Sequence, residues 1–471
     1  MRCHLIVAFK AYYGHGVMRG CLRIRTIYPM NHTIKSMLIA AAALTAVSSY
    51  AQDKSTLDLL VKKGIITAEE RAVALQSASE ARAAAGLNKI FVKEDNAKRL
   101  TFSGRIQTQY ESIGGDYTDN AGTKTEVVDI STAFMRRLYL GFRADIGEGI
   151  SAEIVNNFAD NTLDKALFTA ETSYGTFVLG YQKVQWGLEE NTSSSKLLTV
   201  ERSASNRFWN EAVSSSSIGR LGFGARHTGL HYSNKYAVDA AQTIDYGFSV
   251  ANALQGQGTS TGNNDIGTWA NLIYSYKISD TNRHSIGVNW GAARDSRDAA
   301  ATATAAGVGS AQIKGFNPYI KSQFDKLIVQ AEMISTTNEA RGATASSIER
   351  KPEGYTVLAA YKFTDQIEGV VRYSQLDTDG QGATFSGLYR DATNFASSGL
   401  PLYNKFDSMY YGVNYYFVDH NAKIMFGYEK AKASQRLGST ASATGTSALG
   451  GLIGSGKADS DIFRLQAQVL F

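Results

Sequence analysis

Apolar and polar residues alternate through most of the chain after residue 100. In the stretch FSGRIQTQY, the apolar Phe102, Ile106 and Tyr110 share one face, while Arg105 and Gln107 share the other. The stretches RRLYLGFRADI, TVLAAYKF, IEGVVRYS, YYGVNYYF and KIMFGYE repeat the pattern. A period of two residues is typical of β-strands whose two faces meet different surroundings. The alternation therefore predicts a protein built mostly of β-strands.

The segments between these strands fall into two length classes, short and long, that alternate along the chain. Seven short polar turns are expected near 146–149, 174–175, 233–235, 279–282, 324–326, 364–366 and 419–421. Eight longer stretches rich in small and polar residues are expected at 111–132, 157–163, 185–218, 253–267, 294–311, 337–353, 377–406 and 433–460. Fifteen connections join sixteen strands, so we predict sixteen strands between residue 101 and Phe471.

An even number of antiparallel strands, with short turns at one end and long loops at the other, is typical of bacterial outer-membrane barrels. In hydrocarbon every backbone polar group must be paired within the protein, so the sheet must close on itself. We therefore predict an all-β membrane protein, a 16-stranded antiparallel transmembrane β-barrel over residues 99–471. A soluble sandwich or solenoid also has alternating strands, but strict alternation of its turn lengths is not expected. The final segment, DIFRLQAQVLF, is predicted to close the barrel against the first strand.

The first hundred residues differ from the rest. Residues 30–51 contain one lysine, an apolar stretch and small residues at 49 and 51, which predicts a cleaved signal peptide. Residues 1–29 lack this order and are interpreted as an upstream extension from a start codon set too early. Residues 52–98 contain two helix-capping patterns, and we expect a short periplasmic helical segment that is either coiled-coil-like or a solvated linker.

The net charge and the few cysteine and histidine residues limit the classes of function that the chain can have. The chain carries 48 Lys and Arg against 43 Asp and Glu, but without the six basic residues of 1–51 the balance becomes 42 to 43, which argues against a nucleic-acid partner. Both cysteines, Cys3 and Cys21, precede residue 52, so the expected mature chain has no thiol chemistry. His227 and His231 share a strand face but have no evident third metal ligand. No catalytic motif is present, and we expect no enzyme activity, metal or cofactor.

A sixteen-stranded barrel is wide enough for a water-filled channel, so its inward residues are candidates for function. Because apolar residues face outward, the polar positions between them should line the pore. Inward acidic residues such as Glu153 and Glu332 partly offset the basic ones, and of the pair Arg136 and Arg137 the register turns only Arg137 inward. The residues predicted to steer anions are Arg105, Arg137, Arg143, Lys183, Arg220, Arg226, Lys321, Arg372 and Arg464.

The third long loop is the longest connection of the chain. A loop of this length is often functional, and inside a barrel it can narrow the pore. The alternative is a solvated external loop with paired surface charges. The residues that would form a constriction are Glu189, Glu190, Lys196, Glu201, Arg202 and Arg207.

The stretches FMRRLYLGFRADIGEGISAEI, LGYQKVQWGLEENTSSSKL and VERS resemble the phosphate-selective porin O and P family of Gram-negative outer membranes. The resemblance covers about residues 100–471. It implies a trimeric sixteen-stranded porin that passes small anions, with phosphate or pyrophosphate drawn along inward arginines toward a lysine-lined constriction.

The sequence thus favours passive diffusion of small solutes and inorganic anions across the outer membrane, with lipid, anions and copies of itself as partners. The alternative is a structural or adhesive barrel whose loops at 294–311 and 433–460 bind an external partner.

Overall fold

The computed structural model describes residues 61–62, 99–211, 220–253, 266–294, 310–341, 347–389, 402–437 and 454–471. The chain divides into two compact units, Met1–Val92 and Lys93–Phe471. The expected upstream extension and signal peptide lie outside the described residues. Of the expected helical segment at 52–98, only Val61 and Lys62 are described, and both are helical. No helix among the described residues has the length and apolar character needed to cross a membrane.

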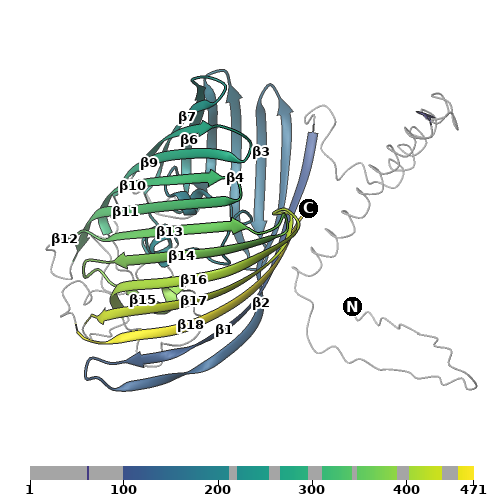
Figure 1. Cartoon of the computed structure of the whole chain (residues 1–471). Helices are drawn as coiled ribbons and strands as arrows, with labels where there is room; N and C mark the ends of the chain where they lie inside the picture. Colours follow the sequence, from purple (N-terminus) through teal and green to yellow (C-terminus); the bar gives the residue numbers. More distant parts are fainter. Residues whose placement is uncertain are drawn as a thin grey trace, which may run out of the picture. The chain divides into compact units, whose positions relative to one another are not determined.

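The second unit is a closed antiparallel β-barrel (Figure 1). Its wall strands are β1 (Arg99–Thr118), β2 (Lys124–Gly147), β3 (Ile150–Asn157), β4 (Thr162–Thr172), β5 (Gly175–Lys183), β6 (Arg226–Ala237), β7 (Gln242–Asn252), β8 (Ile266–Lys277), β9 (Asn282–Arg294), β10 (Ser310–Phe324), β11 (Leu327–Arg341), β13 (Glu353–Lys362), β14 (Ile367–Asp377), β16 (Leu402–Val418), β17 (Ala422–Arg436) and β18 (Lys457–Leu470). Two further strands, β12 (Ser347–Arg350) and β15 (Ala383–Thr384), only extend loops. The sixteen described wall strands confirm the predicted barrel.

The barrel closes where β18 pairs with β1, which lie side by side in Figure 1. The register runs from Arg105 opposite Leu470 to Thr118 opposite Lys457. Beyond it, the Gly104 amide donates to the Phe471 carbonyl at 2.7 Å, and the Phe471 amide donates to the Gly104 carbonyl at 3.1 Å. The last residue is therefore a full member of the sheet, and the sheet has no free edge.

The two faces of the wall have opposite chemistry. Outward side chains such as Ile106, Phe426 and Leu465 are exposed, whereas the inward Gln107 and Gln466 are buried. A soluble protein buries its apolar side chains, whereas this wall turns them outward. A surrounding bilayer requires this arrangement. The predicted alternation, apolar outward and polar inward, is confirmed.

The outward face also shows where the apolar band ends. Tyr411, Tyr428 and Phe463 lie at one level on three adjacent strands, and the rings of Tyr411 and Tyr428 stack at 6.4 Å. The next outward level carries Lys430 and Asp461, whose charged groups lie 3.4 Å apart. An aromatic row followed by charged residues is typical of the edge of a membrane-spanning band.

Two predicted connections are wrong. The first long loop, expected at 111–132, is the five-residue connection 119–123, because β1 and β2 continue to pair up to Thr118 opposite Lys124. The turn expected at 233–235 lies at 238–241, because the polar residues there belong to β6 and have partners in the sheet. Lys235, for example, forms a 3.2 Å ion pair with Asp245 on β7. Polar residues near the end of a hairpin look like turn residues in the sequence.

The closing contact depends on a glycine. A Cβ atom at Gly104 would lie 2.2 Å from the Phe471 ring, which covers this glycine on the outer face. An aromatic ring over a strand glycine compensates for the missing side chain.

We expect Gly104→Val to displace the Phe471 ring and to destabilise the barrel by about 1–3 kcal/mol. The measurement is the urea midpoint of unfolding from lipid vesicles. Thr108→Val, at an outward position on the same strand, is the control and should leave the midpoint unchanged. Equal midpoints for Gly104→Val and the wild type would show that the terminal ring does not stabilise the closure.

Candidate functional site

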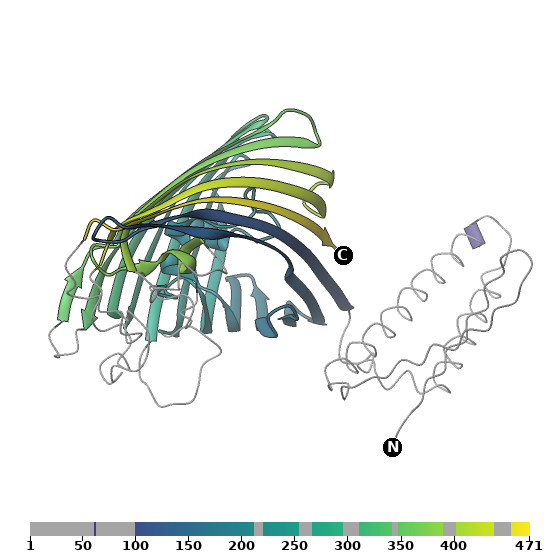
Figure 2. The same cartoon turned by 90° about the horizontal axis from the view of Figure 1, so that it is seen from below.

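The third long loop, called loop 3 here, connects β5 to β6, and its described residues, 184–211 and 220–225, lie inside the ring of strands (Figure 2). It carries two short helices, α3 (Leu188–Asn191) and α4 (Ala204–Asn210). Wall side chains donate hydrogen bonds to its backbone carbonyls at 2.8–3.5 Å from four strands: Gln107 on β1 to Ser194, Asn414 on β16 to Leu198, Lys423 on β17 to Leu197 and Gln468 on β18 to Ser195. Loop 3 therefore crosses the lumen.

A β-bulge turns two consecutive arginines toward this loop. Gln107 on β1 pairs with Arg137, but the next residue, Thr108, pairs with Met135, so Arg136 is an extra residue in β2. Both arginines are buried in the lumen, and the prediction that Arg136 faces outward is wrong. The bulge inserts one residue and breaks the period of two on which that prediction depended.

Glu201 of loop 3 is the partner that Arg136 meets there. Its carboxylate lies 2.5 Å from Arg136 and 2.8 Å from Arg207 of α4. All three side chains are buried. One carboxylate thus ties the barrel wall to the loop helix.

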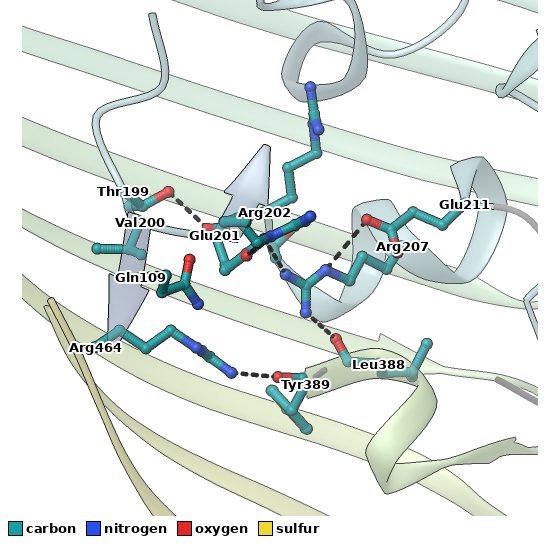
Figure 3. Close-up of polar contacts among 12 residues, drawn as sticks. Gln109, Thr199, Val200, Glu201, Arg202, Arg207, Glu211, Leu388, Tyr389 and Arg464 are labelled. Atoms are coloured by element: carbon teal, nitrogen blue, oxygen red, sulfur yellow. Dashed lines mark hydrogen bonds and ion pairs between the residues drawn. The ribbon is translucent and has the colours of Figure 1, made fainter. Parts of the chain in front are cut away.

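A second loop also enters the lumen. Helix α5 (Phe385–Tyr389) lies in the connection 378–401 between β14 and β16, called loop 7 here. Its last three carbonyls accept hydrogen bonds from arginines. Gly387 accepts from Arg220 at 2.6 Å. Leu388 accepts from Arg207 at 2.7 Å and Tyr389 accepts from Arg464, as Figure 3 shows. The C-terminal carbonyls of a helix lack partners within the helix and carry partial negative charge. Arg207 and Arg220 of loop 3 thereby hold the two loops together, while Arg464 of β18 ties loop 7 to the barrel wall.

Apolar side chains fill the space between the loops and one side of the wall. Phe208 and Trp209 of α4 belong to one buried cluster with Phe385 and Tyr389 of α5. Tyr403 of β16 and other inward wall residues complete it. Sequence reasoning missed this internal core, although FWNEA within a polar loop was a signal for it. The lumen is therefore partly closed by packed protein.

Two of the predicted anion-steering residues are used within this packed part. Arg372 is 1 % exposed and forms ion pairs with Glu189 at 3.3 Å and Glu429 at 2.9 Å. Arg464 is also buried and lies 3.5 Å from the same Glu429. Their charges are balanced by carboxylates at contact distance, so the structure places these two arginines in the loop anchors.

Four other predicted residues line an open cavity of about 290 Å³ on the opposite side, between loop 3 and β2–β6. They are Arg137, Lys183, Arg220 and Arg226. Among the described residues, the lining has six cations and four carboxylates: Arg136, Arg137, Lys183, Arg202, Arg220 and Arg226 against Asp160, Asp164, Glu190 and Glu211. The excess of two positive charges makes the cavity favourable for anions.

Toward the turn end of the barrel, a second basic group follows. Arg105 interacts electrostatically with Arg202 and Arg226 of the cavity wall, and Lys423 interacts with Arg105. In the turn between β16 and β17, burial and the neighbouring Lys423, Lys196 and Lys362 lower the pKa of His420 to about 4. His420 is therefore neutral at pH 7.

The remaining predicted residues lie around this end. Lys321 is exposed, on the face of β10 that also carries the buried, inward Asn317 and Tyr319. Lys196 of loop 3 contributes to the electrostatic field at Lys321. Arg143, close to the turn after β2, pairs with Asp145 at 2.9 Å. Sequence reasoning missed Lys423 and Lys362, because inward positions near the turns do not differ in pattern from those elsewhere in a strand.

The two histidines share the inward face, as expected. The ring nitrogens of His227 lie 2.8 Å from the Asn252 carbonyl and 3.1 Å from the Gly222 carbonyl, and His231 contacts the Ser249 hydroxyl at 2.9 Å. Within the described part of the chain, no group of three or more His, Cys, Asp or Glu is placed to hold a metal ion.

One family model matches most of the barrel. Residues 106–469 match the model of the family "Phosphate-selective porin O and P". No curated protein matches the chain in sequence.

Several solved structures are similar at low sequence identity. The outer membrane channel DcaP of Acinetobacter baumannii is 12 % identical, with a TM-score of 0.47 over 81 % of this chain and 99 % of that one. An anion-selective porin from Comamonas acidovorans is 13 % identical, with a TM-score of 0.47 over 79 % and 99 %. OmpF of Salmonella typhi in complex with daunomycin is 13 % identical, with a TM-score of 0.47 over 80 % and 99 %.

The Glu201 contacts make a prediction about loop 3. Glu201→Ala leaves Arg136 and Arg207 without their shared carboxylate, and breaking a buried ion pair in this way costs about 3–5 kcal/mol. We expect loop 3 to loosen, so that single-channel conductance rises and becomes noisy and trypsin cleaves at loop 3. Glu171→Ala, which removes an exposed carboxylate near a turn, is the control. A quiet channel of unchanged conductance in Glu201→Ala would contradict the anchoring role.

Proposed function

The chain belongs to the phosphate-selective porin O and P family, and on this premise we propose that it lets small solutes and inorganic anions diffuse passively across the outer membrane. One observation carries the preference for anions. The cavity beside loop 3 is lined by six cations and four carboxylates, and the basic group around Arg105 and Lys423 follows it toward the turn end.

The electrostatic argument has two parts. Walls of low dielectric focus the field of the charges that line a cavity, which raises the local concentration of ions of opposite sign. Arginine and lysine side chains that line a pore favour anions over cations. The path would therefore draw anions in beside Arg137 and Arg226 and release them past Arg105 and the lysines.

Phosphate and pyrophosphate are the anions that the family suggests, and we include them among the permeant solutes. The cavity is not built for strong retention, however. Asp164 lies 2.6 Å from Arg226, and Glu211 lies 3.0 Å from Arg220, so part of the positive field is offset within the wall. We propose a channel that prefers anions as a class and holds no single anion tightly.

We also propose a homotrimer in which β3–β5 face a second copy. With eight and nine residues, β3 and β5 are the shortest of the described wall strands. At a tilt of about 40° and about 3.3 Å per residue, eight residues rise only about 20 Å, less than the roughly 25 Å apolar band. A neighbouring protomer would shield this low part of the wall from lipid, which surrounds the rest of the barrel.

Recording from single channels in a planar bilayer tests the function. Under a KCl gradient, the reversal potential should show preference for chloride, and phosphate should carry current or block the chloride current. A purified, folded barrel that conducts no ions would overturn the proposal.

The contribution of the lysines can be measured with one substitution. Lys321→Gln removes a charge from the proposed path, and a unit charge about 8 Å away in water contributes about 0.5 kcal/mol, or about twofold in the permeability ratio. We expect the chloride preference to fall by about that factor. Lys326→Gln makes the same change in the neighbouring exposed turn and should have little effect. Equal effects of the two variants would show that Lys321 does not face the ion path.

A bulky side chain on the short wall tests the assembly. Ala166 faces outward on β4, and Ala166→Trp should block close packing of a second copy, whereas lipid would accommodate the ring. We expect the trimer band in mild detergent to be lost, while Ala467→Trp on the outward face of β18 keeps it. A trimer that tolerates Ala166→Trp but not Ala467→Trp would place the interface elsewhere.

A further inference from the structure

Two cations in the wall of the cavity converge on one carboxylate. The Lys183 ammonium lies 2.7 Å from one oxygen of Glu190, and the Arg202 guanidinium lies 3.2 Å from the other. Glu190 belongs to α3 of loop 3, Lys183 ends β5, and all three residues line the same cavity. The Glu190 and Arg202 side chains are buried, and that of Lys183 is partly exposed.

This arrangement is the one that an oxyanion would take. An anion with two or more oxygens can accept hydrogen bonds from a lysine and an arginine at once, and such charge-assisted bonds are the strongest in proteins. Here the oxygens come from the chain itself. The carboxylate of Glu190 therefore stands where a phosphate or carboxylate solute would otherwise bind.

We propose that Glu190 is an internal counter-ion that occupies an oxyanion-binding site formed by Lys183 and Arg202, and that it sets how weakly the channel holds oxyanions in transit. The inference rests on the proposed anion permeation and names the residue that tunes it. A solute must compete with a tethered carboxylate, whose effective concentration at the two cations is high. Entry stays favourable through the net charge of the cavity, while residence stays short, which is the balance that conduction requires.

Several bonds other than those of the Glu190 carboxylate also hold loop 3 in position. Arg202 also donates to the carbonyls of Glu189 at 3.1 Å and Thr192 at 3.0 Å, and Lys183 donates to the backbone carbonyl of Glu190. At the start of α3, the amides of Leu188 and Glu189 donate to the Glu332 carboxylate at 2.6 and 3.1 Å. These bonds remain when the Glu190 side chain is changed.

The neighbouring Glu189 supplies a matched control. It lies on the same helix and carries the same charge, but its carboxylate accepts hydrogen bonds from the backbone and hydroxyl of Ser203 and lies 3.3 Å from Arg372. Glu189 does not line the basic cavity. Loss of charge alone, or a general loosening of loop 3, would therefore affect both glutamate variants alike.

The test is the block of chloride current by inorganic phosphate in single-channel recordings. In Glu190→Gln, Lys183 and Arg202 face the cavity without their carboxylate, so we expect the phosphate concentration for half block to fall by about tenfold. The dwell time of each blocking event should lengthen, and the chloride preference should rise. Glu189→Gln should block like the wild type, and adding Lys183→Gln to Glu190→Gln should reverse most of the gain.

Two outcomes would overturn the inference: unchanged block in Glu190→Gln, or the same change in Glu189→Gln. If Glu190→Gln does not assemble, Lys183→Gln alone tests the site. In that variant the Glu190 charge is less balanced, so the block by phosphate must weaken. An unaltered block in that variant also refutes the site. A wild-type barrel that does not conduct would instead refute the proposed function, so the two failures are distinguishable.

Discussion

The requirement that every backbone polar group be paired within the sheet determines most of this structure. In hydrocarbon, an unpaired amide or carbonyl costs several kcal/mol, and a sheet edge presents a whole row of them. The chain meets the requirement by pairing β18 with β1 up to the last residue, where Phe471 and Gly104 exchange two hydrogen bonds. Closure also requires the two faces of each strand to differ chemically, because one face contacts lipid and the other encloses a lumen.

That enclosed lumen creates the second problem, which is the placement of charge. Arginines that point into the barrel must be either solvated or paired, since burying an unpaired charge is very costly. The structure uses both solutions. Arg372 and Arg464 are paired and buried against loops 3 and 7, whereas Arg226 and Lys183, which are also paired with carboxylates, line an open cavity. The same residue type thus anchors loops on one side of the lumen and can attract solutes on the other.

The alternation of residues was sufficient to predict the barrel, because a period of two recurs in strand after strand of the wall. It did not predict the β-bulge at Arg136: the consecutive Arg136 and Arg137 break the alternation, but the pattern alone does not tell whether one of them faces outward or a bulge turns both inward. The packing of α4 against α5 was also out of reach. It joins two loops about 180 residues apart, Phe208 to Phe385, and the local sequence of neither loop indicates that the other is its partner. The role of each inward arginine depends on such long-range neighbours, so the sequence predicted which residues face inward better than what they do there.

The carboxylates near the cavity are the feature that separates attraction from retention. A lining of arginine and lysine alone would bind a multivalent anion tightly, and a solute that binds tightly leaves slowly. Asp164 and Glu211 each lie within 3.0 Å of one cavity arginine, while Glu190 is shared by a lysine and an arginine. These carboxylates weaken the local field of each positive charge but leave the cavity with an excess of two positive charges. A channel built this way keeps its long-range preference for anions, which depends on net charge, and gives up short-range affinity, which depends on unpaired donors.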